Sequence, residues 1–203
     1  MYFVRPPYLL KRLYKGAIWR VKQSEKIIYL TFDDGPVPEV TSAVLAILKT
    51  YQINATFFCV GENIGRYPSL FTEILEKHKV GNHTFNHLNA WKTSNYTYYK
   101  NIKKFDTVYQ SSLFRPPYGR ITRTQTRHIS KKYKIIMWDV LSYDYSKNTS
   151  PKKCLSNVMK NVKNGSIIVF HDNKKAVKNL IYALPRSIEQ LLHKGFTFDV
   201  IDL

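Results

Sequence analysis

The sequence is short of acidic residues, of cysteine and of long apolar runs. Its 203 residues include 14 Asp and Glu against 32 Lys and Arg, a formal net charge of +18. Cys59 and Cys154 lie far apart with no CxxC spacing, which argues against a disulfide framework or a thiolate zinc site. No apolar run reaches the roughly 18 residues of a membrane span, and the basic N-terminus lacks the apolar segment of a signal peptide. We therefore expect a location in the cytoplasm or at the membrane periphery.

Signatures of nucleotide and nucleic-acid binding are also missing. The sequence contains neither GxGxxG nor GxxxxGK[ST], and no helix-turn-helix, zinc-finger, RRM or KH pattern accompanies the positive charge. Because a charge of +18 attracts any polyanion, we expect no specific nucleic-acid partner, and contact with an anionic membrane or glycan stays open. The composition, 44% hydrophobic and 14% aromatic, predicts one globular core.

From residue 27 onward, strand-like apolar runs alternate with segments of helical periodicity. The predicted strands are 28–32, 55–60, 79–82, 113–115, 135–139, 167–171 and 197–201. Such alternation is typical of a parallel α/β sheet with right-handed crossovers. Seven units fit a closed barrel or an open doubly wound sheet, and the missing nucleotide-binding motifs disfavour the second.

Residues 8–22 form a separate pattern. Apolar side chains occupy one face of a predicted helix and basic side chains lie off it: Leu9, Leu10, Leu13, Tyr14, Ala17, Ile18 and Val21 against Lys11, Arg12, Lys15, Arg20 and Lys22. We prefer a helix that packs across the end of the barrel, and a membrane-surface anchor is the alternative. We predict an N-terminal segment, 1–26, that packs on a single catalytic domain, 27–203.

Polar residues gather where the predicted strands end, which is where functional groups meet in parallel α/β folds. Five of the 14 acidic residues and three of the six histidines lie at or near these ends. They are Asp33, Asp34, Asp139, Asp144, Asp172, His83, His87 and His171. In such an acid-poor chain this concentration predicts an active site at one rim.

The spacing of these residues indicates metal-assisted hydrolysis. His83 and His87 are four residues apart, so both imidazoles can face one divalent metal, with Asp33 or Asp34 as the third ligand. The other carboxylate can take a proton from a water that the metal activates, while Arg115 holds it ionised. His171 can act as a general acid, positioned by an Asp. Asp-Asp-Gly is also a turn sequence and either histidine can be structural, but such explanations do not account for all four features together.

Several stretches, in this order, closely resemble the polysaccharide deacetylase family, which is carbohydrate esterase family 4 with its NodB-homology domain. They are T-F-D-D-G-P at 31–36, A-T-F-F-C-V-G at 55–61, Y-P at 67–68, G-N-H-T-F-N-H at 81–87, R-P-P-Y-G at 115–119 and I-I-V-F-H-D at 167–172. The resemblance implies a distorted (β/α)7 barrel that hydrolyses N-acetyl groups of amino sugars in glycans such as peptidoglycan or chitooligosaccharide. A related hydrolase that deacylates a small or lipid-linked amino sugar is the alternative.

The resemblance also implies individual roles. Asp33 is then the catalytic base, Arg115 its partner, His171 the general acid and Asp144 the residue that orients it. The implied metal ligands are Asp34, His83 and His87, and the implied ion is Zn²⁺, with Co²⁺ or another divalent ion as alternatives. The implied substrate-binding residues are Pro117, Tyr118, Tyr145 and Val169, with the Tyr118 backbone N–H stabilising an oxyanion. Leu141 and Tyr145 depart from the family's usual Asp-Ser-x-Asp-Trp motif, so the groove is expected to differ. An inactive saccharide-binding scaffold is disfavoured because the metal ligands and the acid are all present.

Overall fold

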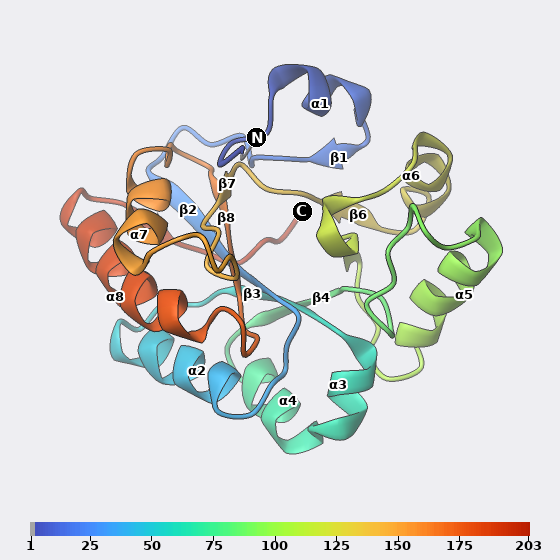
Figure 1. Ribbon diagram of the computed structural model, residues 1–203, viewed down its shortest axis with the longest axis horizontal. Helices are drawn as coiled ribbons and strands as arrows, with labels where there is room; N and C mark the ends of the chain where they lie inside the picture. The colour runs from blue at the N-terminus through green and yellow to red at the C-terminus, as the bar shows by residue number, and fades with distance from the viewer. Residues whose placement is uncertain (1–2) are drawn as a thin grey trace.

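The computed structural model describes residues 3–203 and shows a curled parallel sheet surrounded by helices (Figure 1). The strand order is β1-β6-β5-β4-β3-β2-β8-β7, and β9 pairs with β2 outside this path. The strands are β1 (Ala17–Ile18), β2 (Ile27–Asp33), β3 (Thr56–Cys59), β4 (Lys79–Asn82), β5 (Leu113–Phe114), β6 (Lys134–Ile136), β7 (Val140–Leu141), β8 (Ile167–His171) and β9 (Thr197–Phe198). All named pairs are parallel. The predicted single-domain α/β architecture of the (β/α)7 type is confirmed.

Helices cover the outside of the sheet (Figure 1). They are α1 (Tyr8–Leu13), α2 (Val40–Thr50), α3 (Gly61–Arg66), α4 (Pro68–Leu75), α5 (Asn95–Phe105), α6 (Arg123–Ile129), α7 (Pro151–Met159) and α8 (Val177–His193), with a short 3₁₀ turn at Pro117–Gly119. Three of these helices begin at side-chain caps. Ser94 and Ser150 accept backbone N–H bonds at the starts of α5 and α7, and Thr122 with Gln125 forms a capping box at α6.

The main core lies between the centre of the sheet and helices α2, α7 and α8. Strand β2 is buried along almost its whole length because it has β3 on one side and β8 on the other, as expected for a near-continuous apolar strand covered on both faces. Phe32 stacks on Phe57 with ring centroids 4.9 Å apart. This rigid centre fixes the end of β2, where Asp33 and Asp34 follow.

The N-terminal segment completes the barrel on the side where the sheet is open. Strand β1 pairs with β6 at one edge of the sheet, and at the other edge the Leu141 N–H of β7 donates to the Val4 carbonyl. The helix is shorter than predicted because the chain turns at 14–16 and then enters the sheet as β1. The sequence left two interpretations of this segment, packing on the barrel and anchoring at a membrane surface. The inner face of the segment packs on the barrel. None of the helices in the described part of the chain is long and apolar enough to cross a bilayer.

The expected place of Asp139 at the catalytic rim is wrong. Its carboxylate is fully buried where the N-terminal segment meets the sheet, 2.9 Å from Arg5 and 3.1 Å from Lys11, and it accepts a hydrogen bond from Ser166. Burial acts to raise the pKa of Asp139, but these donors outweigh it and lower the pKa. The strand we predicted over 135–139 stops at Ile136, so the residues that follow belong to a separate connection.

Candidate metal and catalytic site

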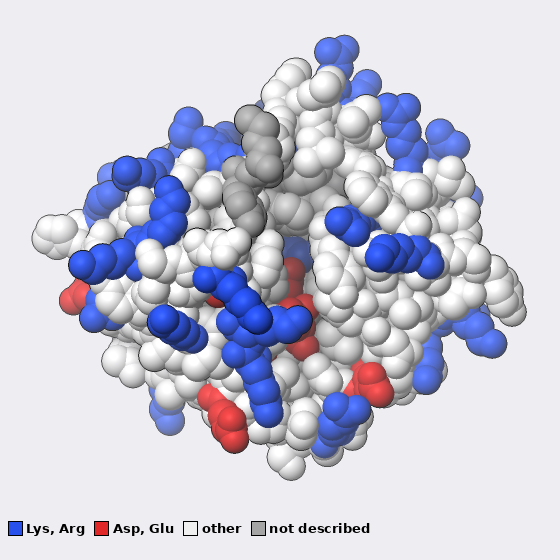
Figure 2. All heavy atoms as spheres, in the orientation of Figure 1, with Lys and Arg blue, Asp and Glu red and all other residues white. Residues whose placement is uncertain are grey.

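A cleft of about 770 Å³ opens at the carboxyl ends of the strands. Figure 2 shows acidic atoms inside this hollow and many Lys and Arg atoms on one side of its rim. The lining contains most of the residues predicted from the sequence: Asp33, Asp34, His83, His87, Tyr118, Leu141, Tyr145, Val169 and His171. Segments that are far apart in the chain therefore meet in one depression.

Asp34, His83 and His87 form a group that could hold a metal ion, with ligand atoms all within 4.8 Å of one another. The Asp34 Oδ1 atom lies 2.9 Å from Nε2 of His87 and 3.5 Å from Nε2 of His83. The Nδ1 atom of His83 is 2.8 Å from the Arg115 carbonyl, so a proton on Nδ1 leaves Nε2 free as a ligand. Burial acts to raise the pKa of Asp34, but the polar contacts with His83 and His87 and the nearby charge of His171 hold it well below its usual range. Two imidazoles and one carboxylate are a typical donor set for Zn²⁺ and similar ions.

The backbone around the site adopts uncommon conformations. Asp34, Thr84, His87, Tyr118 and Tyr143 have positive φ angles of 89°, 64°, 55°, 62° and 60°. Such conformations cost about 1 to 3 kcal/mol each and cluster where the surrounding structure enforces a functional geometry. The loops after β2, β4 and β5 thus aim their side chains inward at the expense of local stability.

Asp33 and Arg115 form a buried ion pair beside the metal group. Nη1 of Arg115 donates to Asp33 Oδ1 at 2.6 Å and to Thr31 Oγ1 at 2.7 Å. The rest of the guanidinium donates to the carbonyls of Ile136 and Met137, and it lies 4.0 Å from the Phe58 ring centroid. Because these contacts hold Arg115 from several directions, Asp33 is presented to the cleft in one orientation.

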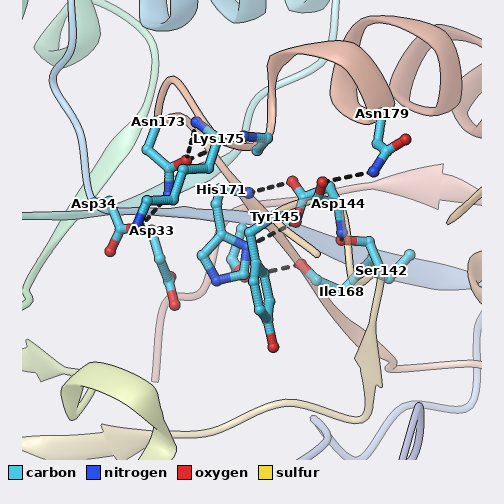
Figure 3. Close-up of polar contacts among 12 residues, drawn as sticks. Asp33, Asp34, Ser142, Asp144, Tyr145, Ile168, His171, Asn173, Lys175 and Asn179 are labelled. Carbon is cyan, nitrogen blue, oxygen red and sulfur yellow. Dashed lines mark hydrogen bonds and ion pairs between the residues drawn. The ribbon is translucent and has the colours of Figure 1, made fainter. Parts of the chain in front are cut away.

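His171 lies beside Asp33, its register partner across strands β2 and β8, and Asp144 holds its ring (Figure 3). Its Nδ1 lies 2.8 Å from Asp144 Oδ1, and its backbone N–H donates to Oδ2 at 2.7 Å. Burial acts to lower the pKa of His171, but attraction to Asp144, Asp34 and Asp33 outweighs it and raises the pKa to about 9. Asn179 of α8 donates to the Asp144 carbonyl at 2.8 Å, which fixes the loop that carries the carboxylate. His171 therefore holds a proton near neutral pH.

Asp172, also expected at the rim, points away from the cleft. Its carboxylate is fully buried and accepts hydrogen bonds from the Gly35 N–H at 2.9 Å and Thr41 Oγ1 at 2.6 Å. A Cβ at Gly35 would lie 1.9 Å from Asp172 Oδ2, so only glycine allows this close approach. Burial raises the pKa of Asp172 to about 7. The residue fixes the loop after β2 from behind.

Three of the four predicted substrate-binding residues line the cleft. Tyr118 is 60% exposed at the cleft and its ring meets that of His87 edge to face. The Tyr145 ring lies 4.7 Å from that of His171 in a T-shaped contact, and Val169 is part of the lining. Pro117 is buried and lies outside the lining; it begins the turn that presents Tyr118.

Sequence reasoning missed several residues that shape the site. Asn173 donates to Asp34 Oδ2 at 2.5 Å and Asn63 donates to the Asp34 carbonyl at 2.8 Å. Trp138, Lys174 and Lys175 also line the cleft. Asn173 could have been found because it follows His171 by two residues at a strand end, whereas nothing in the local sequence marks Asn63.

Comparisons with known proteins agree with this geometry. The sequence model of the family described as polysaccharide deacetylase matches residues 20–138. The peptidoglycan-N-acetylglucosamine deacetylase of Bacillus cereus is 35% identical over 189 residues, which cover 89% of this chain and 88% of that protein. The crystal structure of the Bc1960 peptidoglycan N-acetylglucosamine deacetylase superimposes with a TM-score of 0.88 at 30% identity, covering 97% of this chain and 95% of the other.

A relative described as a pseudoenzyme has the same fold. This protein from Bacillus anthracis superimposes with a TM-score of 0.80 at 25% identity, covering 91% of this chain and 67% of the other. The fold is therefore compatible with inactivity, and any argument for activity depends on the side chains of the site. The family match spans more than half of the chain and the Bacillus cereus relative matches along nearly its whole length. On both grounds, the chain belongs to the polysaccharide deacetylase family.

Proposed function

We propose that the chain is a metal-dependent hydrolase that removes N-acetyl groups from N-acetylglucosamine residues of a peptidoglycan-type glycan. The observation that carries this proposal is that a carboxylate paired with arginine and a histidine paired with aspartate lie in the same cleft as a two-histidine, one-carboxylate group. Amide hydrolysis needs these three components: a base, an acid and a group that stabilises developing negative charge. The relatives named as peptidoglycan deacetylases support the substrate class.

Asp34, His83 and His87 would hold the ion, and their donor set favours Zn²⁺ over harder cations. When bound, a divalent ion lowers the pKa of water and stabilises an oxyanion. Asn173 contributes by occupying Asp34 Oδ2, which turns Oδ1 towards the two imidazoles. The chain thus supplies an oriented set of donor atoms before any ion arrives.

Asp33 is placed to accept the proton of the attacking water. Its partner Arg115 donates a short hydrogen bond to the carboxylate, while Thr31 and two backbone carbonyls stop the guanidinium from turning away. As the water oxygen bonds to the acetyl carbon, one water proton moves to Asp33 and the π pair of the C=O bond moves onto the carbonyl oxygen. Because Arg115 holds Asp33 in one orientation, the reaction does not have to reorganise this side of the cleft.

His171 is placed to donate the proton that the departing sugar nitrogen requires. As the carbon–nitrogen bond breaks, the electron pair stays on nitrogen and the His171 proton is transferred to it, giving a free amino sugar and acetate. Asp144 stabilises the protonated ring through Nδ1 and leaves Nε2 for the donation. The Tyr118 N–H would bind the carbonyl oxygen, and Tyr145 and Val169 would border the acetyl pocket.

We also propose the division of the chain into residues 1–26 and a catalytic domain of residues 27–203. The family match begins at residue 20, and the site residues all lie beyond residue 27. Residues 3–24 join the barrel through β1, which pairs with β6, and through the ion pairs of Arg5 and Lys11 with Asp139.

The decisive test is the Asp33→Asn variant, because Asn keeps the shape of the side chain and removes its basicity. We expect about one divalent ion per chain by plasma mass spectrometry in both proteins, and acetate release from N-acetylglucosamine oligomers or peptidoglycan fragments lowered by about 10² to 10⁴. Asp202→Asn, at an exposed surface ion pair, serves as the control and should keep full activity.

A fully active Asp33→Asn enzyme would rule out the assignment of the base. A wild-type chain that binds metal yet releases acetate only from lipid-linked amino sugars would select the alternative substrate class.

A further inference from the structure

Helix α1 exposes apolar side chains that the fold does not use. Tyr8, Leu9 and Leu13 are 78%, 69% and 41% exposed, and no residue of α1 is buried. At 100° per residue, these three and Arg12 share an arc of about 140° on one side of the helix. We call this set, Tyr8, Leu9, Arg12 and Leu13, the α1 face.

The opposite side of the same segment is what attaches it to the barrel. Lys11 is paired with Asp139 at 3.1 Å, and Tyr14 packs against the apolar cluster around α6. The apolar face predicted from the sequence is therefore divided between two environments. Tyr14 is turned towards the protein, whereas Leu9 and Leu13 are left in water.

The surroundings of the α1 face are cationic. Residues 3–24 contain six basic residues and no Asp or Glu. Beside the exposed leucines, Arg12 and Lys15 are exposed. In Figure 2, uncharged atoms project at the upper edge, where Figure 1 shows α1, with Lys and Arg atoms near them and no acidic atoms at that edge of the view.

We propose that the α1 face docks on an anionic lipid bilayer. Apolar side chains flanked by cations and free of acids match the boundary between anionic headgroups and acyl chains. A second copy of the chain fits less well, because two such faces would bring Arg12 and Lys15 against their own counterparts. The short helix makes the attachment reversible, since only a few apolar side chains enter the bilayer.

Docking in this way leaves the catalytic cleft open. The cleft faces the viewer in Figure 2, while α1 projects from the upper edge of the molecule. The bilayer would therefore hold the barrel by its side. A chain docked at the α1 face can still receive a glycan strand that runs beside the membrane.

The test uses a variant that removes apolar surface without changing charge. Leu9→Ser combined with Leu13→Ser should weaken binding to vesicles of phosphatidylglycerol and phosphatidylcholine at least about tenfold, measured by sedimentation at near-physiological salt. The matched control is Ile181→Ser with Leu192→Ser, two leucine-sized side chains on α8 that are 40% and 39% exposed. Deletion of the segment is avoided because it would leave the buried Asp139 without Arg5 and Lys11.

The wild type should bind these vesicles and not pure phosphatidylcholine, and the control should bind like the wild type. Equal binding by the Leu9/Leu13 variant would overturn the proposal, since adhesion would then come from the charge of +18 alone. The proposal would also be overturned if the wild type formed a concentration-dependent dimer and the Leu9/Leu13 variant did not. That result would show that a second copy of the chain binds the α1 face. Thermal melting should match among the variants. Because vesicle binding needs no catalysis, this outcome is independent of the proposed function.

Discussion

His171 lies among three carboxylates, yet only one of them touches its ring. Asp144 accepts from Nδ1 at 2.8 Å, while Asp34 and Asp33, the register partner of His171 on strand β2, act through space. The contact with Asp144 orients the ring, and the surrounding negative charge keeps it protonated. The pKa of about 9 follows from both, which makes the acid sensitive to single substitutions.

Asp144→Asn should therefore move the alkaline limb of activity to lower pH. A general acid works in its protonated form, which is complete below its pKa and lost above it. Without the Asp144 charge, the His171 pKa falls towards the ordinary histidine value near 6.5, so kcat/KM should drop more at pH 8 than at pH 6. A bound cation lowers this pKa in both proteins, so the measured quantity is the shift between their pH profiles. An unmoved limb would contradict the role of Asp144.

At the scale of elements, the end of β8 is tied to the loop after β2 and to α2 by one buried carboxylate. Asp172 accepts from Gly35 and from Thr41, which itself accepts from Val37. These bonds set the start of the loop that carries Asp34. Because burial raises the pKa of Asp172 to about 7, the link carries an energetic cost once the carboxyl ionises.

Asp172→Asn should gain stability relative to the wild type as pH rises. With its pKa raised, folded Asp172 binds its proton more tightly than the unfolded chain does, so the stabilisation is present at low pH and lost as pH rises through about 7. Asn keeps an acceptor for Gly35 and gains a donor for Thr41, and it does not titrate. Between pH 5 and 8 the difference in free energy of unfolding, variant minus wild type, should grow by about 2 to 3 kcal/mol.

Urea unfolding of the metal-free proteins measures this difference, and a difference that does not change with pH would contradict it. Asp172→Ala leaves the Gly35 N–H unpaired and should be less stable than Asn at both pH values.

The helices and strands show how much of the secondary structure can be predicted from the local sequence. Strands such as Ile167–His171 were predicted at their observed bounds because their apolar runs are long and end in polar residues. The two-residue strands β1 and β7 could not be predicted from the sequence. They form because they pair with β6 and β8, and not because their residues have a strong propensity for strands. Helix α3 was missed because Gly61–Arg66 has little apolar periodicity.

The prediction of the site residues succeeded and failed for the same reasons. Residues at strand ends were predicted because parallel topology brings those ends together, whereas Asp139 and Asp172 have the same local signals and face elsewhere. Their partners lie 134 and 137 residues away, and no local pattern contains that information. The cytoplasmic or peripheral location stays a prediction.

For the whole molecule, the positive charge is distributed unevenly around the cleft. Arg120, Lys174 and Lys175 are exposed residues of the lining, against one exposed acid, Glu62, while Asp33 and Asp34 lie deeper. A cationic rim around an acidic interior attracts an anionic polymer without placing its charges against the base. We therefore expect glycans that carry carboxylates to be bound better than neutral ones.

Lys174→Gln with Lys175→Gln should raise KM for a carboxylated glycan severalfold and leave KM for a neutral chitooligosaccharide nearly unchanged. About 0.5 M salt should remove most of this difference, since such ionic strength screens exposed charges. Lys152→Gln with Lys153→Gln makes the same charge change on α7 outside the cleft lining, and it should have little effect. Equal losses on both substrates would show that the rim does not select for charge.

The buried ion pairs of Asp139 with Arg5 and Lys11 also set an order of events during synthesis. Arg5 and Lys11 leave the ribosome early, but the carboxylate they neutralise comes more than 125 residues later, and Ser166 later still. Until then the first segment has no place to bind, and its leucines and cations are free in the nascent chain. The first segment can dock on the barrel only after Ser166 has emerged, so this part of the fold does not form progressively as residues 3–24 are made.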